Sequence, residues 1–110
     1  MTEIIIRIDN QISIAVTGHA GQAEKGRDIV CSAVSTLTYT AAQMAAEYHS
    51  AGWLEKEPNI KLESGDAEIA FTPKHKRRMR VLDGYKSIVT GYRLIAESYP
   101  DYVKLITHMG

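Results

Sequence analysis

The residues best suited to chemistry lie in one segment, GHAGQAEKGRDIVCSAVS, at residues 18–35. It holds the only cysteine of the chain, Cys31, and a histidine, His19, twelve positions earlier. A thiolate is a strong nucleophile, and imidazole is a common base for generating it. Gly21 and Gly26 give the intervening loop the freedom to bring His19 to Cys31 and to open for a substrate. The spacing therefore predicts a Cys–His nucleophile–base pair.

Asp28 is predicted to be the N-cap of a helix, which makes Cys31 the third residue of that helix. Unpaired N–H groups and the positive end of the helix dipole stabilise a thiolate at such a position. The same N–H groups are candidates for stabilising an oxyanion. We interpret Asp28 mainly as a helix cap. Its second possible role is to orient His19.

Simpler interpretations of these residues stay open. A single cysteine usually packs as a small hydrophobic residue, although Cys31 lies off the apolar stripe that contains Val30 and Val34. A histidine beside a strand end is usually structural or solvated. A redox sensor built on Cys31 is a further alternative, but the chain has no second cysteine to resolve a sulfenic acid. No histidine pair has metal-site spacing, so we predict no metal and no cofactor.

Composition restricts the class of protein. The chain has 110 residues, 45% of them hydrophobic and 24% charged, which predicts one folded domain over residues 1–110. Thirteen basic residues balance thirteen acidic ones, so we predict no direct nucleic-acid binding. No apolar run is read as a membrane span, and the N-terminus lacks the basic region of a signal peptide. A reducing, cytoplasmic setting is expected from the single cysteine.

The periodicity predicts the elements that must position the site. A hairpin is expected over residues 3–17 with its turn at Asp9-Asn10, and a second over residues 60–71 with its turn at 63–66. Amphipathic helices are expected over residues 28–51 and 82–99, and a last strand over 102–107, pairing within the chain or across a dimer. The order strand, strand, helix, strand, strand, helix, strand predicts an α+β fold, with an antiparallel or mixed sheet covered by two helices.

Charge is uneven along the chain. Residues 1–73 hold five basic and ten acidic residues, whereas residues 74–110 hold eight and three. Five of the basic residues fall within residues 74–80. This run is either a solvated entry into the second helix or a docking patch for the ribosome, an acidic protein or RNA. A non-enzymatic binding module that uses residues 74–80 is therefore the alternative function.

The segment that begins Gly18-His19-Ala20, continues through Gly26 and ends in DIVCSAVS (residues 28–35) resembles the ribosomal-processing cysteine proteases. The resemblance implies a small α+β homodimer that removes a short N-terminal extension from a protein, the twenty-seventh protein of the bacterial large ribosomal subunit. Relatives in phages imply a phage protein as another substrate. The resemblance assigns Cys31 as the nucleophile and His19 as the base.

The same resemblance implies a mobile loop that closes over the substrate. It would include Gly18, Ala20, Gly21 and Gly26. The sequence departs from the family pattern at Ala23, where relatives often have glycine, while Gly21 stands two residues earlier. Alanine narrows the backbone angles available at that point, which bears on loop opening and specificity rather than on the Cys–His pair.

Overall fold

The computed structural model describes residues 1–18 and 25–110, with side chains described from residue 29 in the second part. The strands are β1 (Thr2–Ile8), β2 (Ile12–Thr17), β3 (Asn59–Glu63), β4 (Asp66–Phe71) and β5 (Val103–Met109). The helices are α1 (Lys25–Ser50) and α2 (Arg78–Ser98), with a 3₁₀ turn, η1 (His75–Arg77), before α2. The predicted order of elements and the α+β class are confirmed.

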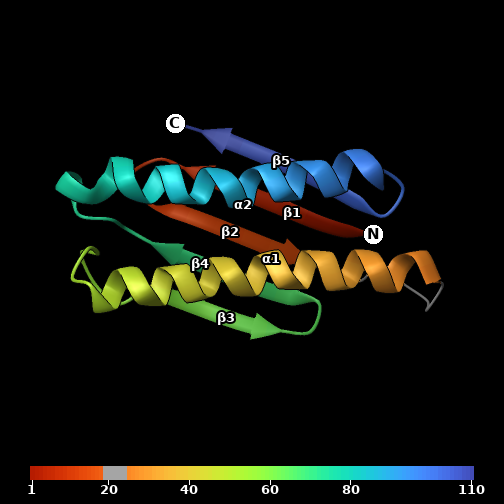
Figure 1. The fold of residues 1–110 in the computed structure, drawn as a ribbon, viewed down its shortest axis with the longest axis horizontal. Coiled ribbons are helices and arrows are strands. Elements are labelled where there is room, and N and C mark those ends of the chain that lie inside the picture. The colour runs from red at the N-terminus through yellow and green to blue at the C-terminus, as the bar shows by residue number, and fades with distance from the viewer. Residues whose placement is uncertain (19–24) are drawn as a thin grey trace.

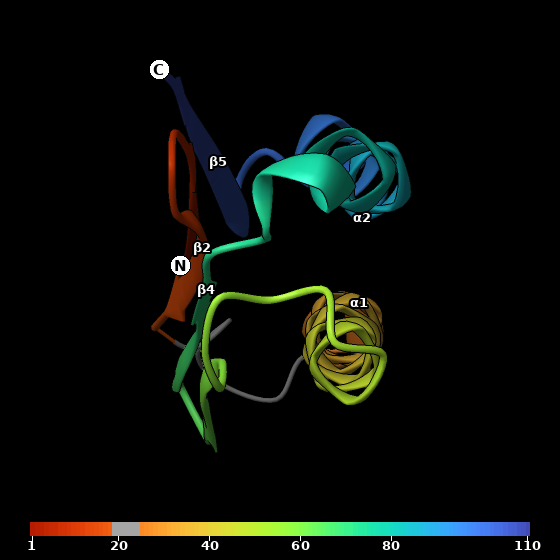
Figure 2. The ribbon, with the colours of Figure 1, turned by 90° about the vertical axis from the view of Figure 1, so that its left-hand side faces the viewer.

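The five strands form one sheet in the order β3-β4-β2-β1-β5. All neighbouring pairs are antiparallel except β1 and β5, which run parallel. The last strand therefore pairs within the chain, and the sheet is mixed. Both helices lie side by side along the same face of the sheet, and the opposite face is left uncovered (Figures 1 and 2).

The core lies between the sheet and the two helices. Strand alternation turns one set of side chains toward the helices, and these are almost fully buried, for example Ile4 and Ile6 in β1 and Ile12 and Ile14 in β2. The first hairpin turns at Asp9-Asn10 as predicted, without a left-handed backbone conformation, because no non-glycine residue in the described part of the chain has a positive φ. Instead the Asp9 side chain accepts a hydrogen bond from the Gln11 N–H at 3.0 Å, so an Asx turn closes the hairpin.

The predicted C-terminal end of the first helix is confirmed. Gly52 has φ +77°, and its N–H donates to the His49 carbonyl at 3.0 Å. The Trp53 N–H donates to the Tyr48 carbonyl at 2.9 Å, and the two rings stack with centroids 5.5 Å apart. This Schellman arrangement with its hydrophobic contact fixes Trp53 at the end of α1.

The first helix begins at Lys25, three residues before the predicted N-cap Asp28 and four before the predicted first helical residue. The backbone is helical from Lys25, so Gly26 belongs to α1 and not to the preceding loop, and Asp28 lies in the first turn and is not the N-cap. Lys and Arg are good helix formers, and one glycine costs only about 1 kcal/mol relative to alanine. Residues 25–27 can therefore be helical even though they show no apolar periodicity.

The length and composition of Ile29–Ser50 would allow this part of α1 to cross a membrane, contrary to our reading of the sequence. Small residues and a single acidic side chain, Glu47, produce this apolar character. In the fold, however, one face of α1 is core, with Val30, Val34 and Ala41 buried. The apolar face of α1 is thus covered by the sheet and by α2.

Candidate active site

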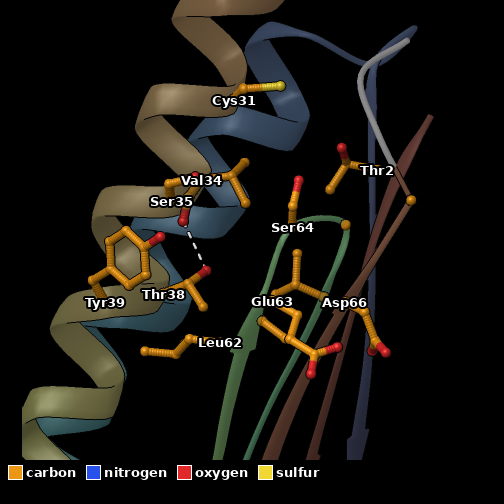
Figure 3. A pocket seen from close by; sticks show the side chains of 14 residues that line it. Thr2, Cys31, Val34, Ser35, Thr38, Tyr39, Leu62, Glu63, Ser64 and Asp66 are labelled. Atoms are coloured by element: carbon orange, nitrogen blue, oxygen red, sulfur yellow. Dashed lines mark hydrogen bonds between the residues drawn. The ribbon is translucent and has the colours of Figure 1, made fainter.

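A pocket of about 270 Å³ lies between the first half of α1 and the end of the sheet where β2 ends and β3 turns into β4. One wall is formed by α1 and the other by the β3–β4 turn (Figure 3). Its lining combines apolar side chains with hydroxyl groups. The lining residues outside the acidic rim are Thr2, Val16, Gly18, Cys31, Val34, Ser35, Thr38, Tyr39, Leu62, Ser64, Gly65 and Ala67.

Cys31 is exposed and borders this pocket. Figure 3 shows its sulfur directed toward the side of α1 that faces the sheet. The neighbouring Val30 and Val34 are buried, which confirms that Cys31 lies off the apolar stripe of the helix. The interpretation of Cys31 as a buried packing residue is therefore wrong, and its thiol is open to a substrate.

Gly18 forms the opposite edge of the pocket, directly before His19 in the chain. Its φ of +89° is a conformation that favours glycine, and its N–H donates to the Gly65 carbonyl at 3.0 Å. A side chain here would place Cβ 2.4 Å from the Met1 carbonyl oxygen. Gly18 thus ties the end of β2 to the β3–β4 turn at the pocket.

Several predicted site residues lie outside the described residues. These are His19, Ala20, Gly21 and Ala23. The contact between His19 and Cys31 stays a prediction. The structure gives only the position of Gly18, the residue before His19.

The early start of α1 changes the predicted electrostatics of Cys31. It is the seventh residue of the helix rather than the third. The free N–H groups of a helix belong to its first four residues, and the dipole effect falls off within the first turn. The helix terminus is therefore not placed to activate Cys31 or to hold an oxyanion there, contrary to our prediction.

A buried hydrogen-bond chain forms the floor of the pocket. The Thr38 hydroxyl, on a residue only 4% exposed, donates to the Val34 carbonyl at 2.7 Å (Figure 3). Because that proton is used, the Tyr92 hydroxyl of α2 donates to Thr38 Oγ1, at 2.8 Å. Burial raises the pKa of Tyr92 to about 12, with the hydrogen bond to Thr38 acting in the opposite direction. These two hydrogen bonds link the floor of the pocket to the buried side of α2.

The sequence contained a signal for part of this lining that we did not use. Cys31, Ser35 and Tyr39 follow one another at four-residue steps, so they share one face of α1. All three border the pocket. No such signal marks Leu62 and Gly65, because the pairing of β3 with β4 alone brings them opposite α1.

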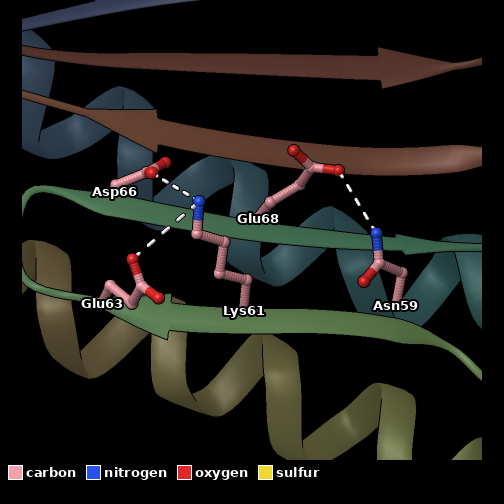
Figure 4. A network of polar contacts seen from close by, with 5 residues as sticks. All are labelled: Asn59, Lys61, Glu63, Asp66 and Glu68. Atoms are coloured by element: carbon pink, nitrogen blue, oxygen red, sulfur yellow. Dashed lines mark hydrogen bonds and ion pairs between the residues drawn. The ribbon is translucent and has the colours of Figure 1, made fainter.

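The acidic residues at the pocket rim belong to a small surface network. Lys61 Nζ lies 2.6 Å from Asp66 Oδ2 and 3.9 Å from Glu63 Oε2, and Asn59 donates to Glu68 (Figure 4). The hydrogen bond to Asp66 raises the pKa of Lys61. Strand alternation places these side chains on the uncovered face of the sheet, whereas Leu62 between them faces α1. The carboxylates therefore do not point into the pocket.

The family model for the cysteine protease Prp matches residues 1–104. The chain belongs to the Prp cysteine protease family. Its activity is accordingly that of a cysteine-type peptidase. No curated protein matches the chain.

Solved structures share the Prp fold. The S. aureus ribosomal processing protease Prp in complex with a substrate peptide has a TM-score of 0.70 at 16% identity, covering 97% of this chain and 99% of that one. The same protease with a covalently linked product peptide has a TM-score of 0.69 at 17% identity, with the same coverage. SMU.848 from Streptococcus mutans has a TM-score of 0.67 at 24% identity, covering 99% and 93%.

Proposed function

We propose that this protein is an endopeptidase in which Cys31 is the nucleophile and His19 the general base. Family membership supports the reaction class. The observation that carries the assignment of Cys31 is its exposure at a pocket whose other edge is Gly18, the residue before His19. The proposed unit is a single protease domain over residues 1–110.

The reaction follows from this pair. His19 takes the thiol proton of Cys31, and the sulfur attacks the scissile carbonyl of a peptide lying along the pocket. When the tetrahedral intermediate collapses, His19 protonates the leaving amine and a thioester to Cys31 remains. Water, deprotonated by His19, then releases the acyl group. Asp28, in the first turn of α1, keeps its proposed second role of orienting His19.

The pocket lining favours an extended peptide with an apolar side chain. Val16, Val34 and Leu62 supply apolar surface, and Tyr39, which is 59% exposed, adds an aromatic ring at the rim. Covering such a surface with a substrate side chain contributes about 25 cal/mol for each Å² removed from water. We infer that this surface seats one side chain next to the scissile bond.

We further propose that the substrate is the N-terminal extension of a ribosomal protein, the twenty-seventh of the large subunit. Two solved structures of this fold are described as a ribosomal processing protease with peptide bound. A phage protein with a similar extension is the second candidate, because the resemblance implies relatives in phages. Action in the cytoplasm as a homodimer, with the loop between Gly18 and α1 closing over the peptide, completes the proposal.

The test is a cleavage assay on the long form of that ribosomal protein's N-terminal segment, read by mass spectrometry. The native protein should make a single cut. Cys31→Ser and His19→Ala should each lower the rate by at least about a thousandfold, since the residues of a catalytic unit are each required for the full effect. Ser32→Ala, a neighbouring exposed hydroxyl on α1, is the matched control and should cleave normally. Normal cleavage by Cys31→Ser would refute the assignment.

A further inference from the structure

The end of the molecule opposite the pocket carries a basic patch. We define it as four residues around η1 and the start of α2, which are Lys74, Lys76, Arg77 and Arg80. The pocket lies at the N-terminal end of α1 and this patch beside its C-terminal end, so the two are separated along the 44 Å axis of the molecule (Figure 1). The patch is therefore a surface distinct from the active site.

The cations of the basic patch have no acidic partners within the described part of the chain. There, the only ion pairs are those that Lys61 makes with Asp66 and Glu63. No acidic residue occurs between Glu68 and Asp83. The positive charge of the patch is thus free to attract an external anion.

The position of these cations is unfavourable for the helix itself. The first turn of α2 contains no acidic residue and its N-cap, Arg77, makes no side-chain capping bond. Positive charges at the positive end of a helix dipole destabilise the helix. The backbone N–H of Arg78, the first residue of α2, already donates to the His75 carbonyl of η1, so an external anion would be bound by the side chains of the patch.

Two arginines of the patch are held in place by an aromatic ring. The guanidinium carbons of Arg77 and Arg80 lie 5.0 and 5.9 Å from the centroid of the Trp53 ring. Trp53 itself is fixed by its stack on Tyr48 and by the turn that ends α1. Cation–π contacts of this kind leave the N–H edges of a guanidinium available for further hydrogen bonds.

A third arginine of the same run has a structural role. Arg78 donates to the carbonyl oxygens of Asp9 and Asn10 in the β1–β2 turn. It anchors the start of α2 to the sheet, which gives the basic patch a rigid support. Arg78 is therefore left out of the patch and out of the tests.

We propose that the basic patch binds the phosphodiester backbone of a nucleic acid. A backbone presents regularly spaced negative charges with several acceptor oxygens each, which suits two planar guanidinium forks and two lysines. A carboxylate side chain offers one planar acceptor pair and would use fewer of these donors. The balanced net charge led us to predict no such binding, but Glu63 and Asp66 border the pocket, and within the described residues no ion pair neutralises the cations of the patch.

The magnitude follows from counter-ion release. Four contacts to a single strand predict a slope of about −2.8 for the logarithm of affinity against the logarithm of salt concentration. Raising the salt concentration from about 50 to about 200 mM should then weaken binding about 50-fold. Loss of two contacts should make the slope shallower, from about −2.8 to about −1.4.

The experiment measures fluorescence anisotropy of a labelled single-stranded RNA of twelve nucleotides, with the DNA of the same sequence and a poly-glutamate of equal charge as second and third probes. The full chain is compared with Arg77→Gln/Arg80→Gln. The matched control is Arg93→Gln/Lys104→Gln, which removes the same charge from exposed positions outside the patch. Trp53 is the only tryptophan, so its emission reports binding at the patch directly.

We expect RNA and DNA to bind within about threefold of each other, with the salt slope above. The patch variant should bind at least tenfold more weakly and the control variant normally, and Cys31→Ser should bind as the native chain does. Circular dichroism should confirm that both double variants are folded. No binding at low salt, equal losses in the two double variants, or a more than tenfold preference for one nucleic acid would each overturn the proposal. Poly-glutamate binding as tight as RNA would also overturn it, in favour of an acidic protein partner.

Discussion

Replacement of Gly18 by alanine should damage both stability and catalysis. Gly18 has φ +89°, and a Cβ at this residue would lie 2.4 Å from the Met1 carbonyl oxygen, which is a backbone atom. The unfavourable backbone conformation costs about 1–3 kcal/mol. Shifting the backbone to relieve the contact endangers the hydrogen bond from Gly18 to Gly65, worth about 1 kcal/mol. We expect a total loss of about 3 kcal/mol.

Gly52→Ala is the matched control. Gly52 also has a positive φ, +77°, but a Cβ there would meet no atom within 4 Å. In this variant only the unfavourable backbone conformation lowers the free energy of unfolding, by about 1–2 kcal/mol. It lies at the far end of α1, so cleavage should be unchanged, whereas Gly18→Ala displaces the pocket edge that leads to His19 and should lower the rate at least tenfold.

Chemical denaturation followed by Trp53 emission measures the free energies of unfolding. Intact mass must show Met1 in every sample, because the contact of Gly18 is with this residue. The cleavage assay is run below the unfolding transition of each variant. Equal destabilisation by the two substitutions, or full activity of Gly18→Ala, would refute the steric argument.

Further predictions concern the packing of α2. Burial raises the pKa of Tyr92 to about 12 and also raises that of Tyr85, so both stay protonated in the native state while unfolded tyrosines ionise near pH 10. The contribution of each tyrosine to the free energy of unfolding should be fully present below pH 10 and fall above it by about 1.4 kcal/mol per pH unit, up to the pKa of the native state. Tyr92→Phe should therefore remove about 1.4 kcal/mol of the loss of stability between pH 9 and 11, and an unchanged loss would contradict the assignment. Gly91→Ala places Cβ 2.8 Å from a methyl of Leu37 and should cost about 1–2 kcal/mol despite its helix propensity. In a Leu37→Ala background it should be neutral or stabilising, and additivity in the double-mutant cycle would show that the two side chains do not clash.

Local patterns predicted most of the fold. The period of two in Ile4, Ile6, Ile12 and Ile14 identified the first hairpin, because one face of each strand is buried. The end of α1 was predicted from Gly52, since a positive φ there suits glycine alone. The parallel pairing of β5 with β1 was not predicted, because it depends on where α2 returns the chain to the sheet.

The candidate site was predicted in part. The exposure of Cys31 followed from its position off the stripe of Val30 and Val34, which is a property of helix geometry. The start of α1 was wrong by three residues, because helix ends are decided by capping and by small differences in propensity. The role of Leu62 in the pocket depends on a contact between distant parts of the chain, and no local pattern contains it.

The most direct test of the central claim is to trap the acyl-enzyme on Cys31. Native protein is mixed with the substrate segment, quenched rapidly in acid, and its intact mass and peptide map are measured beside those of Cys31→Ala. We predict an added mass equal to the N-terminal fragment minus one water, located on the peptide that contains Cys31 and absent from the variant. Cleavage that persists in Cys31→Ala, with no adduct on the native chain, would contradict the assignment of Cys31 as the nucleophile.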